Sequence, residues 1–163
     1  MTAVGNELIN NDPIVARNFY LDMGGNKSVV LSGIAGFDIE MDVVSVQQNG
    51  ANGQQQHVKT LGGVLKAPEM TVTRMAPLNT ASDPIWIWFN GIRNAGMKAD
   101  KRGQYRKHIS IVLCDSSFDE VGRFNLLNAW PSKIASDSLS TDSNEAMKEN
   151  ITFQCERIDR VSK

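Results

Sequence analysis

The sequence predicts a mainly β domain of the α+β class, built as a barrel or sandwich with one flanking helix. Three observations lead to this prediction. Apolar residues recur at every second position in short runs separated by turn residues, which is typical of half-buried strands. Only residues 84–95 have helical spacing of their apolar side chains. The 163 residues, 41% hydrophobic and 21% charged, are enough for one domain with its own core and argue against wholesale disorder.

The first part of the chain contains strands separated by glycine-rich turns. We expect a first strand over residues 17–23 and a turn at 24–26, where the sequence is Gly-Gly-Asn. A second strand region covers 29–46, interrupted by Gly33 and Gly36. Within it three carboxylates alternate with apolar residues, and a period of two places them on the wet face of a half-buried strand: Asp38, Glu40 and Asp42.

Residues 47–56 consist of Gln, Asn and Gly with one alanine. Such a segment has little to bury and much backbone entropy to lose, so we expect a long hairpin loop that orders against a partner. Its candidate contact residues are Gln48, Asn49, Asn52, Gln54, Gln55 and Gln56. Further strands are expected over 57–61 and 68–75, with two glycines between them.

A helix begins after Ser82. Asp83 is suited to accept a hydrogen bond from an unpaired amide as N-cap, Pro84 suits the first helical position, and Gly96 suits the end. Apolar side chains at positions i, i+3, i+4 and i+7 form one stripe, which we expect in the core together with a later tryptophan: Ile85, Trp88, Phe89, Ile92 and Trp130.

Strands resume after a basic turn. We expect them over 108–114 and 121–129, with Pro131 ending the second one. A Ser/Asp-rich loop covers 136–144, and a last strand covers 149–161.

The motifs of common catalytic and cofactor sites are absent. No P-loop, GxGxxG, HExxH or GxSxG string occurs, and the two histidines, His57 and His108, lie far apart in the sequence. We therefore expect no catalytic residue, no cofactor and no metal site. Cys114 and Cys155 belong to no CxxC pair and are expected to be buried free thiols.

Charge and hydropathy give no sign of a nucleic-acid-binding module or a membrane protein. The net charge is -1, and the longest apolar run, residues 85–89, is far shorter than the roughly 18–20 residues that cross a bilayer. The N-terminus has no basic and apolar regions of a Sec signal, so we expect synthesis in the cytoplasm.

The second half contains a specific combination of motifs. Residues 83–93 read DPIWIWFNGIR, and residues 123–133 read RFNLLNAWPSK. They are followed by DSNE at 142–145 and ENITFQCE at 149–156. With these motifs the chain resembles, over residues 17–161, the tail tube proteins of contractile phages and the inner tube proteins of extracellular contractile injection systems.

The resemblance implies a structural protein and not an enzyme. It implies a β-barrel domain over 17–163 that forms hexameric rings, with strands of neighbouring subunits joined into one continuous barrel. The rings would stack into a tube that carries DNA or protein inside a contractile sheath, in a virion or an injection particle, with no membrane insertion. We expect residues 1–16 to form an N-terminal arm, which has no obvious counterpart in the resemblance.

Under the resemblance, the other partners are sheath, baseplate, spike and terminator proteins. The Gln/Asn loop would contact the next ring, and the carboxylates at 38, 40 and 42 would face the lumen. Two alternatives remain: a specialised baseplate-proximal ring of the same family, or a monomeric β-domain that binds glycans or peptides.

Overall fold

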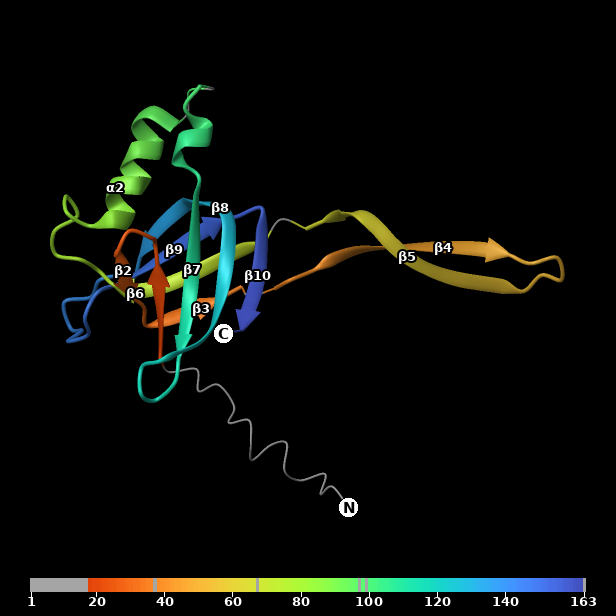
Figure 1. Cartoon of the computed structure of the whole chain (residues 1–163), viewed down its shortest axis with the longest axis horizontal. Coiled ribbons are helices and arrows are strands. Elements are labelled where there is room, and N and C mark those ends of the chain that lie inside the picture. The colour runs from red at the N-terminus through yellow and green to blue at the C-terminus, as the bar shows by residue number, and fades with distance from the viewer. Residues whose placement is uncertain (1–17, 37, 67, 97, 99, 163) are drawn as a thin grey trace, which may run out of the picture.

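The computed structural model describes residues 18–36, 38–66, 68–96, 98 and 100–162, and the expected N-terminal arm lies outside them. The mainly β prediction is confirmed (Figure 1). The strands are β1 (Phe19–Asp22), β2 (Ser28–Val30), β3 (Gly33–Ala35), β4 (Met41–Asn49), β5 (Gln55–Leu65), β6 (Glu69–Met75), β7 (Lys107–Cys114), β8 (Glu120–Ser136), β9 (Lys148–Gln154) and β10 (Arg157–Ser162). The helical segments are α2 (Pro84–Gly91), the π-helical turn η1 (Ile92–Gly96) and the 3-10 turn η2 (Arg102–Tyr105).

The main sheet closes on itself through the segment 28–35. Its strand order is β2-β1-β7-β8-β9-β6-β3, and the two end strands are joined in sequence by Leu31 and Ser32 alone. β2 pairs with β1, β3 pairs with β6, and the backbone N–H of Ser32 donates to the carbonyl of Thr73 at 2.8 Å. One continuous segment therefore connects both ends of the sheet, and the strands form a barrel.

β8 joins two parts of the barrel. Its first half pairs with β7 and β10, and its second half pairs with β9. The expectation that Pro131 ends the strand is wrong, because β8 continues to Ser136 with a register shift between Pro131 and Lys133. β7 pairs with β8 only as far as Ala129, so Pro131 lies where the strand has one partner, and a proline is tolerated at such an edge.

The last strand, expected to be continuous over 149–161, is interrupted. β9 ends at Gln154 and β10 begins at Arg157. The N–H of Glu156 nevertheless donates to the carbonyl of Leu127 at 3.0 Å, so the chain continues along the same edge of β8 across the break.

α2 begins as expected. The carboxylate of Asp83 accepts a hydrogen bond from the N–H of Trp86 at 2.9 Å, and Pro84 occupies the first turn. The expected helix over 84–95 is divided, because α2 ends at Gly91 and the wider turn η1 continues to Gly96.

The core fills the barrel and includes side chains from the helix. Ile85 and Trp88 of α2 belong to the same buried cluster as the inward-facing residues of the strands. The fully buried strand residues of this cluster are Leu21, Met70, Val72, Ile111, Leu126, Ala129, Ile151 and Phe153. The helix is thus part of the barrel's single core, not a separate surface element.

Candidate functional site

The most unusual feature of the chain is the hairpin of β4 and β5, which projects away from the barrel (Figure 1). Among the described residues the two strands pair only with each other. Their register has Met41 opposite Leu65 and, after a shift, runs from Val43 opposite Leu61 to Asn49 opposite Gln55. A short turn at its tip is held by a hydrogen bond from the N–H of Gly50 to the carbonyl of Gln54 at 2.8 Å. An isolated two-stranded hairpin is only marginally stable in water, so this one is suited to a partner.

The two faces of the hairpin differ in chemistry. Because side chains alternate along a strand, Val44, Val46, Val58 and Thr60 share one face, which we call the valine face. Val44, Val46 and Val58 are 43%, 42% and 46% exposed. The opposite face carries six polar side chains beyond the pair of Val43 and Leu61: Ser45, Gln47, Asn49, Gln55, His57 and Lys59. A row of exposed β-branched side chains on a hairpin that projects from the main sheet is typical of an assembly surface.

The prediction of a ten-residue loop over 47–56 is wrong. Gln48 and Asn49 lie in β4, and Gln55 and Gln56 lie opposite them in β5. Asn52 and Gln54 are in the turn at the tip. Amide side chains do not prevent strand pairing when the ladder is made by the backbone, and all six candidate residues are exposed at the outer end of the hairpin.

The prediction of a half-buried strand with Asp38, Glu40 and Asp42 on its wet face is also wrong. Asp38 and Glu40 precede β4, and Asp42 is the second residue of β4, so they do not share one strand face. Their apolar neighbours Ile39 and Met41 are 57% and 60% exposed, because this segment has left the barrel. Phe37 lies outside the described residues.

At the base of the hairpin, Glu40 forms an ion pair with Lys66 at 2.7 Å. The hydrogen bond from Lys66 lowers the pKa of the Glu40 carboxyl below its ordinary value. The Asp42 carboxylate lies against Gly62 of β5, where a Cβ atom would be 2.8 Å from its Oδ2 atom. Both contacts join the segment that enters the hairpin to the one that leaves it.

A buried ionic cluster, not expected from the sequence, ties α2 to the barrel. Arg74 of β6 is 3% exposed and donates two hydrogen bonds of 2.7 Å to Asp83. It also donates to Glu149 of β9 at 3.2 Å, and the other oxygen of Glu149 accepts from the indole N–H of Trp86 at 3.1 Å. One signal in the sequence was available: Arg74 follows Met70 and Val72 at a spacing of two, so it faces inward and needs a carboxylate partner.

The contacts within this cluster stabilise the charged forms of Arg74 and Asp83 despite their burial. Burial alone would raise the pKa of the Asp83 carboxyl, but the hydrogen bonds from Arg74 and from the N–H of Trp86 outweigh burial and lower it. Burial opposes the charge of Arg74, and its hydrogen bonds with Asp83 reverse that effect and raise its pKa. The cluster is therefore a stable ion pair that fixes the start of α2.

The expected core residues lie as follows. Ile85 and Trp88 are buried, and Phe89, Ile92 and Trp130 are partly buried, with Ile92 and Trp130 packed against the core. The indole N–H of Trp88 donates to the carbonyl of Tyr105 at 2.6 Å. The ring centroids of Trp88 and Phe153 are 5.8 Å apart, so the helix packs against the core of the barrel through this contact.

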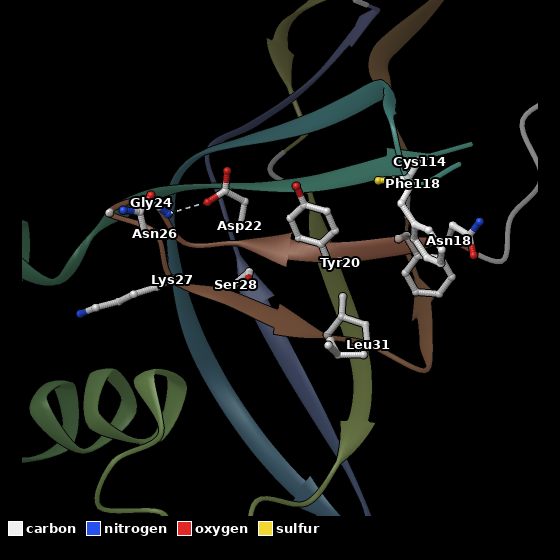
Figure 2. Close-up of a pocket in the computed structure, with 13 residues that line it drawn as sticks. Asn18, Tyr20, Asp22, Gly24, Asn26, Lys27, Ser28, Leu31, Cys114 and Phe118 are labelled. Atoms are coloured by element: carbon white, nitrogen blue, oxygen red, sulfur yellow. Dashed lines mark hydrogen bonds between the residues drawn. The ribbon is translucent and has the colours of Figure 1, made fainter. Parts of the chain in front are cut away.

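A groove of about 770 Å³ lies on the outside of the barrel beside β1 and β2. Figure 2 shows polar residues such as Asp22 and Lys27 at one end and Phe118 at the other. Val30 and Phe118 are 83% and 76% exposed there. The Asp22 carboxylate accepts from the N–H of Gly24 at 2.9 Å, which stabilises the turn between the strands.

The described residues contain no group of three or more His, Cys, Asp or Glu side chains placed to hold a metal ion. His57 lies on the exposed hairpin, and His108 accepts a hydrogen bond from the N–H of Asn128 at 3.3 Å, so the structure does not bring the two histidines together. Cys114 and Cys155 are free and buried. No helix in the described part of the chain is long and apolar enough to span a membrane.

Comparisons with known proteins agree with this architecture. The family model described as "T4-like virus tail tube protein gp19" matches residues 15–159. A sequence search of curated proteins finds no match. Among solved structures, the tube-terminating cap of the anti-feeding prophage is similar with a TM-score of 0.76 at 21% identity, covering 100% of both chains.

Two other solved structures are similar over nearly their whole length. The sheath–tube complex of the extracellular contractile injection system PVC, in its extended state, gives a TM-score of 0.72 at 19% identity over 98% of both chains. The six-fold symmetrised baseplate of the anti-feeding prophage gives 0.71 at 14% identity, covering 93% of this chain and 97% of the other. At these identities the structures establish the shared fold.

Proposed function

The chain belongs to the T4-like virus tail tube protein family, and from this premise we propose that its hairpin joins successive rings of a tube. The chain is a structural tail tube subunit of a contractile tail or injection system, and it is a component of the assembled particle. The observation that carries the proposal is the hairpin itself: it leaves the barrel and exposes its valine face.

Within a ring, open sheet edges favour contacts between identical subunits. β10 pairs only with β8 in the described chain, and beyond Ala129 β8 pairs only with β9. Open edges promote association until a neighbouring copy covers them, and a ring covers them in every copy. We therefore propose rings of six in which these edges meet, a number that the six-fold symmetry of the related baseplate supports.

Along the axis, the hairpin is the element that reaches beyond its own barrel. We propose that its outer end, with Gln48, Asn49, Asn52, Gln54, Gln55 and Gln56, contacts a subunit of the next ring. The exposed amides would form hydrogen bonds there, and burial of the valine face would supply the hydrophobic contribution.

We also propose that Asp38, Glu40 and Asp42 face the lumen. Support comes from the exposure of Asp38 and Glu40 at the base of the hairpin. Because Lys66 pairs with Glu40, this wall would repel anions less than three separate carboxylates would. A tube structure with these side chains between subunits or toward the sheath would contradict the proposal.

The partners follow from the same proposal. Related proteins occur in complexes described as a sheath–tube complex, a tube-terminating cap and a baseplate. We propose that this chain likewise contacts a contractile sheath, a terminator and a baseplate, and that the tube carries DNA or protein.

The experiment is removal of the hairpin's outer end. Deleting residues 48–55 removes the tip and leaves the barrel core intact. We expect folded subunits with unchanged circular dichroism from the barrel, but no tubes by negative-stain electron microscopy under conditions where the full chain forms them. Tubes of normal length from the deletion variant would contradict the role of the hairpin.

A further inference from the structure

The end of the barrel opposite the hairpin contains two loops, over 76–82 and 137–147 (Figure 1). β6 leads from the hairpin to this end, since Glu69 lies opposite the end of β9 and Met75 lies opposite its first residue, Lys148. The two loops are adjacent, because the N–H of Ala76 donates to the carbonyl of Met147 at 2.9 Å. The hairpin and the loops are therefore at opposite ends of one strand.

This far end exposes large apolar side chains. Leu78 is fully exposed, and Leu139 is 77% exposed. Met75, the last residue of β6, and Met147, the last residue of loop 137–147, are 56% and 38% exposed. Large apolar side chains exposed on two loops and a strand end at one end of a domain are typical of a contact surface.

The charges of the two ends are complementary. Loop 137–147 carries three exposed carboxylates and no basic residue: Asp137, Asp142 and Glu145. Between Val43 and Leu65 the only charged side chain is Lys59, which is exposed. Neither Lys59 nor the three carboxylates form an ion pair within the described part of the chain.

We propose that loops 76–82 and 137–147 form the receiving surface for the hairpin of a second copy of this chain. The valine face packs on Leu78 and Met75, and the opposite face directs Lys59 toward the acidic loop. A surface and its complement at opposite ends of one chain give a head-to-tail contact that leaves a free site at each end, so rings add without limit. This inference rests on the proposed role of the hairpin and adds the surface that receives it.

The groove beside β1 and β2 is the competing receiving surface. It also exposes apolar side chains, Val30 and Phe118, but its charged residues Asp22 and Lys27 have opposite signs. β2, whose residues line this groove, also lies on the side of the barrel away from the hairpin (Figure 1), so it is charge and not position that separates the groove from the loops. The observations favour the loops, and the experiment below includes the groove.

The test is a disulfide between copies in assembled tubes. The variant Val46→Cys/Leu78→Cys is assembled, oxidised mildly and run on a non-reducing denaturing gel. We expect a ladder of covalent multimers that collapses on reduction, and no ladder from either single variant. The native thiols cause little background, because Cys114 and Cys155 are 4% and 5% exposed and burial raises the pKa of the Cys155 thiol to about 11.

The matched control is Val46→Cys/Val30→Cys, which tests the groove. Tubes that give a ladder from this pair and none from the Leu78 pair would overturn the proposal and place the hairpin in the groove. Tubes that give no ladder from either pair would also overturn it. If deletion of residues 48–55 leaves tube growth normal, the role of the hairpin itself fails, so the two failures are distinguishable.

A charge exchange tests the ionic part. Lys59→Glu should raise the concentration needed for tube growth by roughly tenfold, because like charges then face each other. Adding Asp142→Lys and Glu145→Lys should restore growth, and Lys27→Glu, on the turn between β1 and β2, should leave it unchanged. Equal growth of Lys59→Glu and Lys27→Glu would contradict the pairing of Lys59 with the acidic loop.

Discussion

Arg74 and Asp83 form a two-fold hydrogen-bonded ion pair, with both contacts at 2.7 Å, that links the end of β6 to the start of α2. Asp83 is also the N-cap of α2, so one carboxylate serves both the helix and the barrel. Glu149 completes the cluster from β9. The position of the helix is thereby fixed by a few buried charges in addition to the packing of Ile85 and Trp88.

Replacing Arg74 with Ala should destabilise the subunit by about 3–5 kcal/mol, because Asp83 and Glu149 would remain buried without a counter-charge. Urea unfolding of dissociated subunits measures the change. The control is Arg157→Ala, which breaks an exposed pair with Asp159 and should cost no more than about 1 kcal/mol. Similar losses from the two variants would show that the buried cluster adds nothing specific.

Acid should weaken the subunit through Asp83. Its pKa in the folded state is lowered by Arg74 and the N–H of Trp86 despite burial, so the carboxylate stabilises the fold at pH values above its unfolded pKa of about 4. That contribution is lost as the pH falls through the lower, folded pKa. Asp83→Asn should therefore be less stable than the natural chain at pH 7, with a smaller difference at pH 3. Urea midpoints at the two pH values measure this, and an equal difference at both would contradict it.

Gly36 should tolerate no side chain. Its φ is +89°, and a Cβ atom would lie 2.4 Å from the carbonyl oxygen of Glu69. Gly36→Ala should cost at least about 2 kcal/mol, since the left-handed conformation alone costs about 1–2 kcal/mol and β6 must also move. Gly63→Ala in β5 is the control, because a Cβ atom there meets nothing within 4 Å. Thermal unfolding compares the two, and similar melting temperatures would contradict the expected clash.

The sequence predicts the local structure best where the signal is local. The N-cap at Asp83 and the proline after it define the start of α2, and alternation of apolar residues identifies the strands of the barrel. Closure of the barrel was not predictable in this way. Residues 28–35 form a single segment that pairs with β1 on one side and β6 on the other, and no local pattern reveals two partners far apart in the chain.

The hairpin shows a second limit of predicting structure from the sequence. The alternation over residues 37–43 predicts a half-buried strand, which presumes that the burial partner lies within the same chain. Here Val44, Val46 and Val58 have no such partner among the described residues, because the hairpin lies outside the barrel. The glutamines and asparagines at its outer end predict a loop, since their uniform polarity has no period that would indicate strands. Where apolar side chains are buried only by another copy of the chain, their pattern in one sequence does not show what buries them.

A charge on the valine face should separate folding from assembly. Val46→Lys places an ammonium group on an exposed strand outside the core, so the free energy of unfolding should change by no more than about 0.5 kcal/mol. Tube growth should stop, because assembly would bury that charge against apolar side chains of another copy. Gln47→Lys, next in sequence but on the opposite face, is the control and should still assemble. Sedimentation and negative-stain microscopy measure growth, and urea unfolding checks the subunit. Tubes from Val46→Lys as abundant as those from Gln47→Lys would show that the valine face stays in solvent in the tube.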